Sequence, residues 1–321
     1  MDELEIIGDP RRLREFQPEW SRFVQKLAPA NPFQMPEWLL TWWSHFGSGE
    51  LRTMVFRRNG EVVGVLPCFL HEWKGRRQFT LVGSGITDYL DPLFEPLCVD
   101  RILDLLRKQL GHWTDWDICD WQDLSPDSPL RTLGTTVEET PCTEIAIQQP
   151  FEEFLSTRGK DLRRNLRRYR QQAQAHGSVQ FDVTEFADPK LIDALIELHR
   201  ARWAEHGESG MIEANHSERF LRDVTGLLAR RGSLKIFSVR FADRIAAILL
   251  ALSNRSTIFS YLSAFDPRTE TFGFGRELLA QALRYAHDGG YRCWNFLRGN
   301  EPYKFSWGAQ MVPKCRVVIL P

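Results

Sequence analysis

One stretch near the end of the chain, Ile258 to Gly308, constrains the fold more than any other. Its pattern predicts a strand, a loop with two glycines, an amphipathic helix, a second strand and a short polar segment that carries a tyrosine. A glycine loop that leads into a helix N-terminus places main-chain amides and the positive end of the helix dipole beside each other, an arrangement that binds phosphate groups. The stretch therefore favours an α/β protein that holds a pyrophosphate-bearing acyl carrier.

Length and charge limit the broad class. A chain of 321 residues predicts two domains of about 150 residues each. The net charge of −1 gives no attraction of the whole protein to nucleic acid or to a membrane surface. No apolar run is long enough to span a membrane, and the N-terminus has no apolar core of a secretory signal. We expect a cytoplasmic protein without a membrane span.

The cysteines and histidines do not follow a metal-binding pattern. None of the six cysteines lies in a C-x-x-C pair, and the eight histidines form no H-x-x-x-H pair with supporting ligands. Four of the cysteines, Cys68, Cys119, Cys142 and Cys293, lie in apolar strand-like runs, which is typical of buried free thiols. We expect no metal site and a reducing compartment.

Both halves of the chain show a similar order of elements. The first half predicts a strand, two helices, a β-hairpin that turns at Asn59-Gly60, a glycine- and aspartate-rich loop, a helix and two strands. The second half predicts one or two charged helices, a strand, two helices, three strands joined by tight turns, and then the stretch described above. We place the boundary at Gln149-Pro150. The predicted fold class is α/β (α+β) with two tandem domains, 1–149 and 150–321, each a mixed, mostly antiparallel sheet flanked by helices.

Several segments, taken in this order, resemble a known superfamily. They are NPFQMPEWLLTWW, GVLPCFL, GSGITDYLDPLF, LRRNLRR, LHRARWAEHGE, YLSAFDP and FLRGNEPYKFSWGA. The chain is similar to the Gcn5-related N-acetyltransferases, and more narrowly to the CelD-like tandem-domain group that is related to the FemABX transferases. The resemblance implies two acyl-CoA N-acyltransferase-like domains, the first on the acceptor side and the second binding the carrier. It implies acetyl-CoA or another acyl-CoA as co-substrate.

The carrier-binding signature of that superfamily is R/Q-x-x-G-x-G/A. Gly273 and Gly275 occupy its glycine positions, but Glu270 stands where a cation or glutamine is usual, so Arg276 is the nearby cation that could face a pyrophosphate. By resemblance, the carrier-binding residues are Tyr261, Leu262, Ser263, Gly273, Phe274, Gly275 and Arg276. The first three end a strand that, in the superfamily, parts from the next strand. Without the resemblance, the same glycines could simply form a turn, and the same strand could simply be part of the core.

Acyl transfer to an amine needs a proton donor for the leaving thiolate and a base for the amine. Similar enzymes place a tyrosine where Tyr303 stands, with Lys304 beside it to assist. The candidate bases are Glu301, Asp88, Asp91, His199 and Glu208, and none stands out. Candidate substrate-binding residues are Tyr89, Asp91, His199, Arg202, Trp203 and Lys304. Asp91 precedes a proline and is also a turn former, and Trp203 is also explained by packing.

A run of basic residues opens the second half. Helical spacing places Arg163, Arg167 and Arg170 on one stripe, which is either a solvated face or a site for a phosphate-bearing partner such as CoA, a lipid or sugar diphosphate, or tRNA. We expect transfer of an acetyl or other acyl group from CoA to an amine of a small molecule or of an envelope or polysaccharide precursor. The alternatives are FemABX-like transfer from aminoacyl-tRNA, which the net charge disfavours, and a non-catalytic scaffold in polysaccharide assembly.

Overall fold

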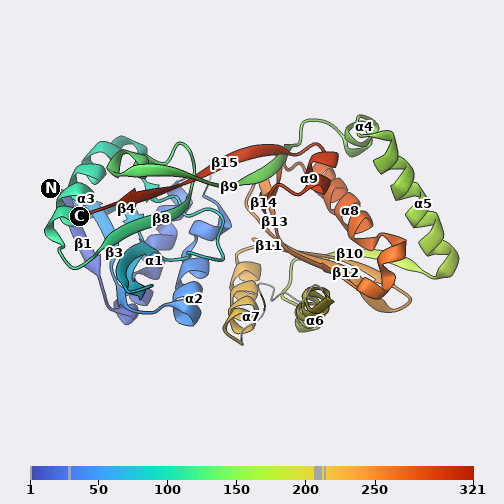
Figure 1. The fold of residues 1–321 in the computed structure, drawn as a ribbon, viewed down its shortest axis with the longest axis horizontal. Helices are drawn as coiled ribbons and strands as arrows, with labels where there is room; N and C mark the ends of the chain where they lie inside the picture. The colour runs from blue at the N-terminus through green and yellow to red at the C-terminus, as the bar shows by residue number, and fades with distance from the viewer. Residues whose placement is uncertain (1, 28–29, 206–211, 213–214) are drawn as a thin grey trace. The chain divides into compact units, whose positions relative to one another are not determined.

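The computed structural model describes residues 2–27, 30–205, 212 and 215–321 (Figure 1). The chain divides into two compact units, one that runs to Pro141 and includes Pro313–Pro321, and one that comprises Cys142–Val312. The sequence placed the boundary at 149/150 and the C-terminal end in the second domain. The structure divides the chain earlier because residues 142–146 pair with a strand of the second unit. It returns the C-terminal end to the first unit because that end pairs with a strand there.

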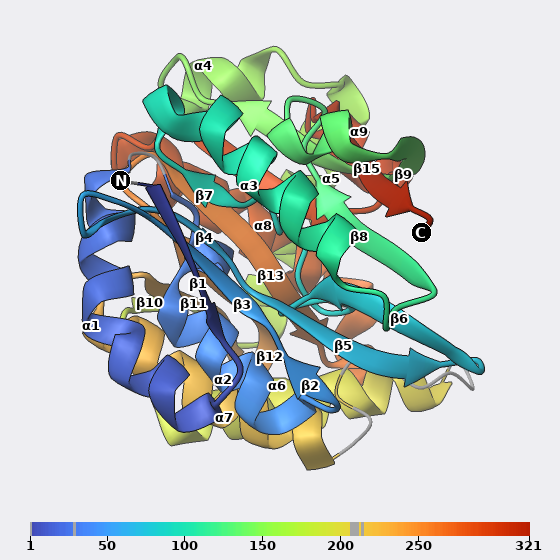
Figure 2. The same cartoon turned by 90° about the vertical axis from the view of Figure 1, so that its left-hand side faces the viewer.

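The first unit contains two groups of paired strands and three α-helices among its described residues. One group has the order β1-β3-β4-β7 and the other β15-β8-β6-β5-β2. The strands are β1 (Asp2–Ile7), β2 (Glu50–Leu51), β3 (Thr53–Arg58), β4 (Glu61–Leu66), β5 (Cys68–Trp73), β6 (Arg76–Leu81), β7 (Leu93–Phe94), β8 (Ile118–Leu124) and β15 (Gln310–Ile319). The α-helices are α1 (Pro10–Lys26), α2 (Pro36–Phe46) and α3 (Val99–His112). Figure 2 shows β1, β3 and β4 side by side.

The predicted turn of the β3–β4 hairpin is confirmed. Arg58 pairs with Glu61, and the two residues between them, Asn59 and Gly60, have φ values of 50° and 82°. These left-handed conformations suit asparagine and glycine, and their twist matches that of the flanking strands.

The second unit has one sheet with helices on both faces. Its order is β10-β11-β12-β13-β14-β9, and β9 (Thr135–Ala146) contributes residues 142–146. The other strands are β10 (Val179–Thr184), β11 (Leu234–Phe241), β12 (Arg244–Ser253), β13 (Thr257–Phe265) and β14 (Cys293–Arg298). The helices are α4 (Phe151–Ser156), α5 (Lys160–His176), α6 (Pro189–Glu205), α7 (Asn215–Arg230), α8 (Phe274–Asp288) and α9 (Pro302–Ser306). Figure 1 shows α6 and α7 on one face of the sheet and α8 on the other. The predicted mixed, mostly antiparallel sheet is confirmed, since among the described strands of this unit only β13 and β14 pair in parallel.

The cysteines of the described chain are free thiols. Cys68, Cys119 and Cys142 are buried, as predicted, whereas Cys293 is only half-buried. Burial raises the pKa of Cys68 and Cys119 well above the usual value for a thiol. They are therefore core side chains and poor nucleophiles. Among the described helices, none is both long and apolar enough to cross a membrane.

Candidate functional site

Strands β13 and β14 pair over only three residues and then part. Thr257, Ile258 and Phe259 pair with Cys293, Trp294 and Asn295, and beyond Phe259 no further pair joins the two strands. On its other edge β13 stays paired with β12 as far as Phe265. The main chain of β13 from residue 260 onward therefore lies along an edge that β14 does not cover, where an extended ligand can pair with it.

Irregular backbone on both strands accompanies this parting. The register of β13 with β12 shifts at Tyr261, and the register of β14 with β9 shifts at Phe296. Bulges bend a strand and increase its twist, so two bulges at this level help the strands to diverge. Leu297 follows with a φ of 61°, and its amide donates a 2.8 Å hydrogen bond to Oδ1 of Asn295. The side chain of Asn295 thus holds a backbone conformation that is unfavourable for leucine.

The glycine loop lies at the N-terminus of α8. Gly273 is the residue before the helix and has a left-handed φ of 63°. The first amides bonded into the helix are those of Arg276 and Glu277, which donate to the Gly273 carbonyl at 3.0 and 3.2 Å. The amides of Phe274 and Gly275 precede them and lie at the positive end of the helix. Because the side chain of Phe274 is buried, this residue offers a ligand its main chain only.

Both glycines also have a packing reason. A Cβ atom on Gly273 would lie 2.8 Å from the ring of Tyr169 in α5, and one on Gly275 would lie 3.3 Å from the ring of Phe265 at the end of β13. Any side chain at 273 would displace Tyr169. The loop is therefore tightly packed on its side-chain side, and its amides are what remain for a ligand.

Cations gather around Tyr169, beside this loop. The Arg276 guanidinium donates to the Tyr169 hydroxyl at 3.3 Å, and the guanidinium of Arg168 lies 4.8 Å from the centre of the ring. Their hydrogen bonds and charges lower the pKa of Tyr169. Glu270, the residue that departs from the superfamily signature, is exposed. The positive field at the start of α8 thus comes from α5 as well as from Arg276.

Tyr303 lies on α9, just after β14. Its ring is 49% exposed and packs edge-on against Phe296 at 6.2 Å between centroids. Burial of the hydroxyl and the nearby Glu301 raise the pKa of Tyr303 to about 12, and Arg202 opposes this shift. The phenol is therefore protonated throughout the physiological range.

Arg202 connects Tyr303 to the start of α8. Its guanidinium, which projects from α6, lies 4.7 Å from the centre of the Phe265 ring. The same ring also lies against Gly275. One guanidinium thus acts on the Tyr303 hydroxyl and covers the end of β13, so that residues from α6, β13, α8 and α9 come together.

Lys304 lies on α9 and holds the segment between β14 and α9 in place. It is 2% exposed, and its ammonium donates to the carbonyl oxygens of Arg298 at 2.8 Å and Gly299 at 3.2 Å. The third contact is an ion pair of 2.8 Å with Oε2 of Glu301. An ammonium has three protons, so these partners use all of its donors. Lys304 therefore fixes the segment that carries Tyr303 and does not present its charge to the phenol.

His199 is a poor candidate for a general base. It lies on α6, is 3% exposed, and has its ring 5.9 Å from that of the half-buried Trp203. Burial, and then the charges of Arg202 and Arg200, lower its pKa to about 4. The imidazole is neutral at pH 7 and holds a proton too weakly to accept one from an amine. Another candidate base, Glu208, lies outside the described residues.

The remaining candidates belong to the first unit. The Asp91 carboxylate accepts the amide of Ser125 with both oxygens at 3.0 Å, and burial raises its pKa. Lys314 of β15 is buried, donates to the Asp123 carbonyl at 2.7 Å, and places its ammonium 4.1 Å from the centre of the Tyr89 ring. Asp91 and Tyr89 thus hold this loop together. Asp88 is half-buried.

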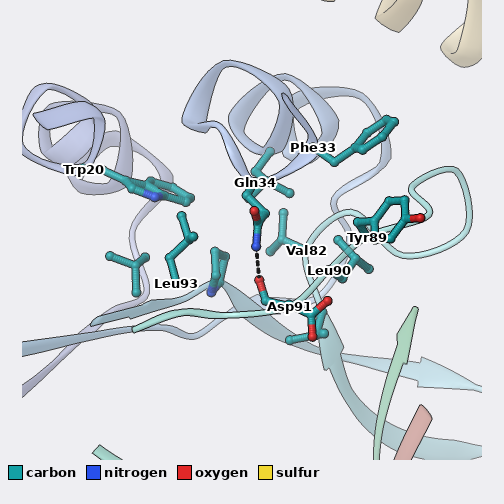
Figure 3. A pocket seen from close by; sticks show the side chains of 12 residues that line it. Trp20, Phe33, Gln34, Val82, Tyr89, Leu90, Asp91 and Leu93 are labelled. Atoms are coloured by element: carbon teal, nitrogen blue, oxygen red, sulfur yellow. Dashed lines mark hydrogen bonds between the residues drawn. The ribbon is translucent and has the colours of Figure 1, made fainter. Parts of the chain in front are cut away.

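A small cavity lies beside the Asp91 loop. Figure 3 shows the Gln34 side chain reaching from the segment before α2 to the main-chain oxygen of Asp91, a hydrogen bond of 2.9 Å. The cavity has a volume of about 20 Å³, which is room for about one water. It is too small for a substrate.

Three features of the site were missed by the sequence reasoning. Tyr169 was noted only as a lone aromatic in a basic helix, and Phe265 and Asn295 were not singled out. An asparagine three residues before the end of a strand is a weak signal of a bulge, and nothing in the sequence connects Tyr169 to Gly273. Among the described residues, no group of three or more histidines, cysteines or carboxylates is arranged to hold a metal ion.

Comparison with known proteins agrees with this geometry. Residues 160–305, which run from α5 to α9, match the model of the acetyltransferase (GNAT) domain family. No curated protein sequence matches the chain significantly.

Solved structures match nearly the whole chain. FemX is 12% identical, with a TM-score of 0.66 over 99% of this chain and 97% of that one. The C-terminal DUF2156 domain of a putative lysylphosphatidylglycerol synthetase from Agrobacterium fabrum is 14% identical, with a TM-score of 0.60 over 95% and 92%. A tandem GNAT protein from the clavulanic acid biosynthesis pathway is 12% identical, with a TM-score of 0.52 over 100% and 98%. These likenesses show the fold, which is that of tandem GNAT domains.

Proposed function

We propose that this chain, an acyltransferase of the GNAT type, transfers an acetyl or other acyl group from CoA to an amine of a small molecule or of an envelope or polysaccharide precursor. The observation that carries the proposal is the parting of β13 and β14 beside the N-terminus of α8. The proposal places the reaction in the cytoplasm, in keeping with the free thiols.

The acyl carrier would be held mainly by main-chain atoms. Its extended arm would pair with the edge of β13 at Tyr261, Leu262 and Ser263, and its pyrophosphate would accept the amides of Phe274 and Gly275. Arg276 would supply a positive charge to the pyrophosphate, which Glu270 cannot do. The amides of the β13 edge would also stabilise the oxyanion that forms as the amine attacks.

The chemistry exchanges one bond to the acyl carbon for another. The amine nitrogen forms a bond to the thioester carbonyl carbon and the carbon–sulfur bond breaks. Glu301, which also forms an ion pair with Lys304, takes the proton from the amine. The Tyr303 hydroxyl gives its proton to the departing sulfur.

The raised pKa of Tyr303 sets a condition on this step. A phenol near pKa 12 is a weaker acid than a thiol at about 8.5, so a complete proton transfer to a free thiolate would be uphill. The proton must therefore move while the carbon–sulfur bond breaks. Arg202 assists, because its charge stabilises the phenolate.

Calorimetric titration with acetyl-CoA tests the carrier site. The wild type should bind and a Gly275→Trp variant should not, because the indole would displace Phe265 and cover the amides at the start of α8. Gly226→Trp is the matched control, since position 226 on α7 has open space around its Cβ. Equal affinity of wild type and Gly275→Trp, or no binding by the wild type, would sink the proposal.

Transfer from aminoacyl-tRNA is the second candidate. Glu270 in the carrier loop and the arginines of α5 favour it. Two of the similar structures carry the names FemX and putative lysylphosphatidylglycerol synthetase. It predicts salt-dependent binding of aminoacyl-tRNA that is lost when Arg163, Arg164 and Arg167 are replaced by alanine.

A further inference from the structure

A groove in the second unit is lined by residues of α4, α5 and α8. Its volume is about 340 Å³, within the range of about 300–1,000 Å³ that is usual for small-molecule sites. It is lined by apolar and cationic side chains together. They are Phe151, Glu152, Leu155, Ser156, Arg163, Leu166, Arg167, Arg170, Ala280, Gln281 and Arg284.

Two of the four arginines in the groove are already neutralised. Arg170 pairs with Glu277 at 2.7 Å, and Arg284 pairs with Glu152 at 2.6 Å. Arg163 and Arg167 make no ion pair with any carboxylate of the described chain. Two positive charges therefore face this groove without a counter-charge from the described residues.

Arg163 supplies a second, independent observation. Its Nε is fully enclosed by protein and has no hydrogen-bond acceptor among the described residues. Enclosing such a donor without an acceptor is unfavourable, and more so when the group is charged. The terminal nitrogens of Arg163 are not enclosed in this way, so they are the atoms through which its guanidinium can bind a ligand oxygen in the groove.

The outer side of the same helix behaves differently. Arg164 is 72% exposed and pairs with Asp161 at 2.7 Å. Arg168 stacks on Tyr169 beside the glycine loop that precedes α8. The sequence could not separate a solvated basic face from a binding stripe, and the structure divides the arginines of α5 into both kinds.

The groove is separate from the candidate carrier site. The residues of α8 that line it are Ala280, Gln281 and Arg284, which follow Gly275 by five, six and nine residues. At 1.5 Å per residue the groove begins about 8 Å from Gly275 along the helix axis. A ligand in the groove therefore does not occupy the amides at the start of α8.

We propose that this groove binds a phosphate ester carried on an apolar or aromatic group, with Arg163 and Arg167 on the phosphate. Guanidinium groups bind phosphate oxygens through paired, charge-assisted hydrogen bonds. Phe151, Leu155, Leu166 and Ala280 provide the apolar wall for the organic part. The phosphate is that of a soluble ester or of a phospholipid headgroup. The site adds to the proposed acyl transfer and does not depend on it.

Calorimetry on the full chain tests the groove with phenyl phosphate, and with inorganic phosphate and benzyl alcohol as comparison ligands. We expect phenyl phosphate to bind more tightly than inorganic phosphate, and benzyl alcohol not to bind. Arg163→Gln/Arg167→Gln should weaken phenyl phosphate at least tenfold. The control Lys160→Gln/Arg164→Gln removes the same charge from exposed positions of α5 and should change the affinity less than twofold.

A measurement on the wild type guards against a misfolded variant. Phenyl phosphate should protect Arg163 and Arg167, but not Arg164, from modification by phenylglyoxal, as read by mass spectrometry of peptides. Co-sedimentation with vesicles that contain 20% phosphatidylglycerol identifies the source of the phosphate. Vesicle binding that is lost only in the groove variant indicates a lipid headgroup. A protein that binds phenyl phosphate but no vesicles indicates a soluble ester.

Three results would overturn the proposal. The first is no binding and no protection by phenyl phosphate. The second is equal loss in the groove and control variants, which would mean a general effect of charge. The third is a tRNA that displaces phenyl phosphate from the wild type and whose own affinity falls equally in the two variants. In that case α5 would be a basic surface that attracts RNA by its charge alone.

Discussion

His199 makes the stability of the second unit depend on pH, and replacing this one residue should remove that dependence. In the unfolded chain a histidine takes up a proton near pH 6.5, but in the folded chain the buried imidazole does so only near pH 4. Between these values the unfolded state binds more protons, so stability is complete above pH 6.5 and falls as the pH is lowered. Below pH 6.5 the free energy of unfolding falls by about 1.4 kcal/mol for each pH unit. The wild type should therefore lose about 2 kcal/mol through this residue when the pH is lowered from 7.5 to 5.

The measurement compares urea unfolding of the wild type and His199→Gln at several pH values. His199→Gln should lose about 2 kcal/mol less than the wild type on going to pH 5, whatever its stability at pH 7.5. His176→Gln, on an exposed position of α5, should keep the wild-type dependence. An NMR titration that finds His199 protonating near pH 6.5 would refute the reasoning, as would an unchanged pH dependence in His199→Gln.

Three further substitutions test the site. Tyr303→Phe should lower kcat by about 100-fold or more with little change in KM, because a general acid acts only in the chemical step; an unchanged kcat would remove Tyr303 from the mechanism. Gly273→Ala should lower stability by about 1–3 kcal/mol, since φ is 63° and Tyr169 occupies the space of the Cβ, and a thermal denaturation midpoint equal to that of the wild type would contradict this. Lys304→Met should lower stability by about 2 kcal/mol by leaving buried carbonyl oxygens unsatisfied, and a variant as stable as the wild type by urea unfolding would show that its contacts are dispensable.

Local chemistry made several features of both units predictable. Asn59-Gly60 forms the expected hairpin turn, Gly273 takes the left-handed conformation before a helix, and Tyr303 follows the strand that the pattern indicated. Arg163, Arg167 and Arg170 share a groove because residues three and four apart lie on one side of a helix. Each of these features depends on spacing along the chain.

Long-range pairing was beyond the sequence. Only the resemblance implied the parting of β13 from β14, because β14 takes its other partner, β9, from far away in the chain. The burial of Lys304 could not be foreseen either, since lysine is almost never fully buried unless it is paired. Its partners include the carbonyls of Arg298 and Gly299, and main-chain oxygens have no signature in the sequence.

The return of the C-terminal strand to the first unit has a consequence for synthesis on the ribosome. The second unit, Cys142–Val312, is one continuous segment, so it can complete its fold as soon as it emerges. The first unit emerges earlier but waits for β15, which pairs with β8 and buries Lys314 beneath Tyr89. The half made first is therefore finished last, and a chain that stops before Pro313 would leave β8 with an unpaired edge.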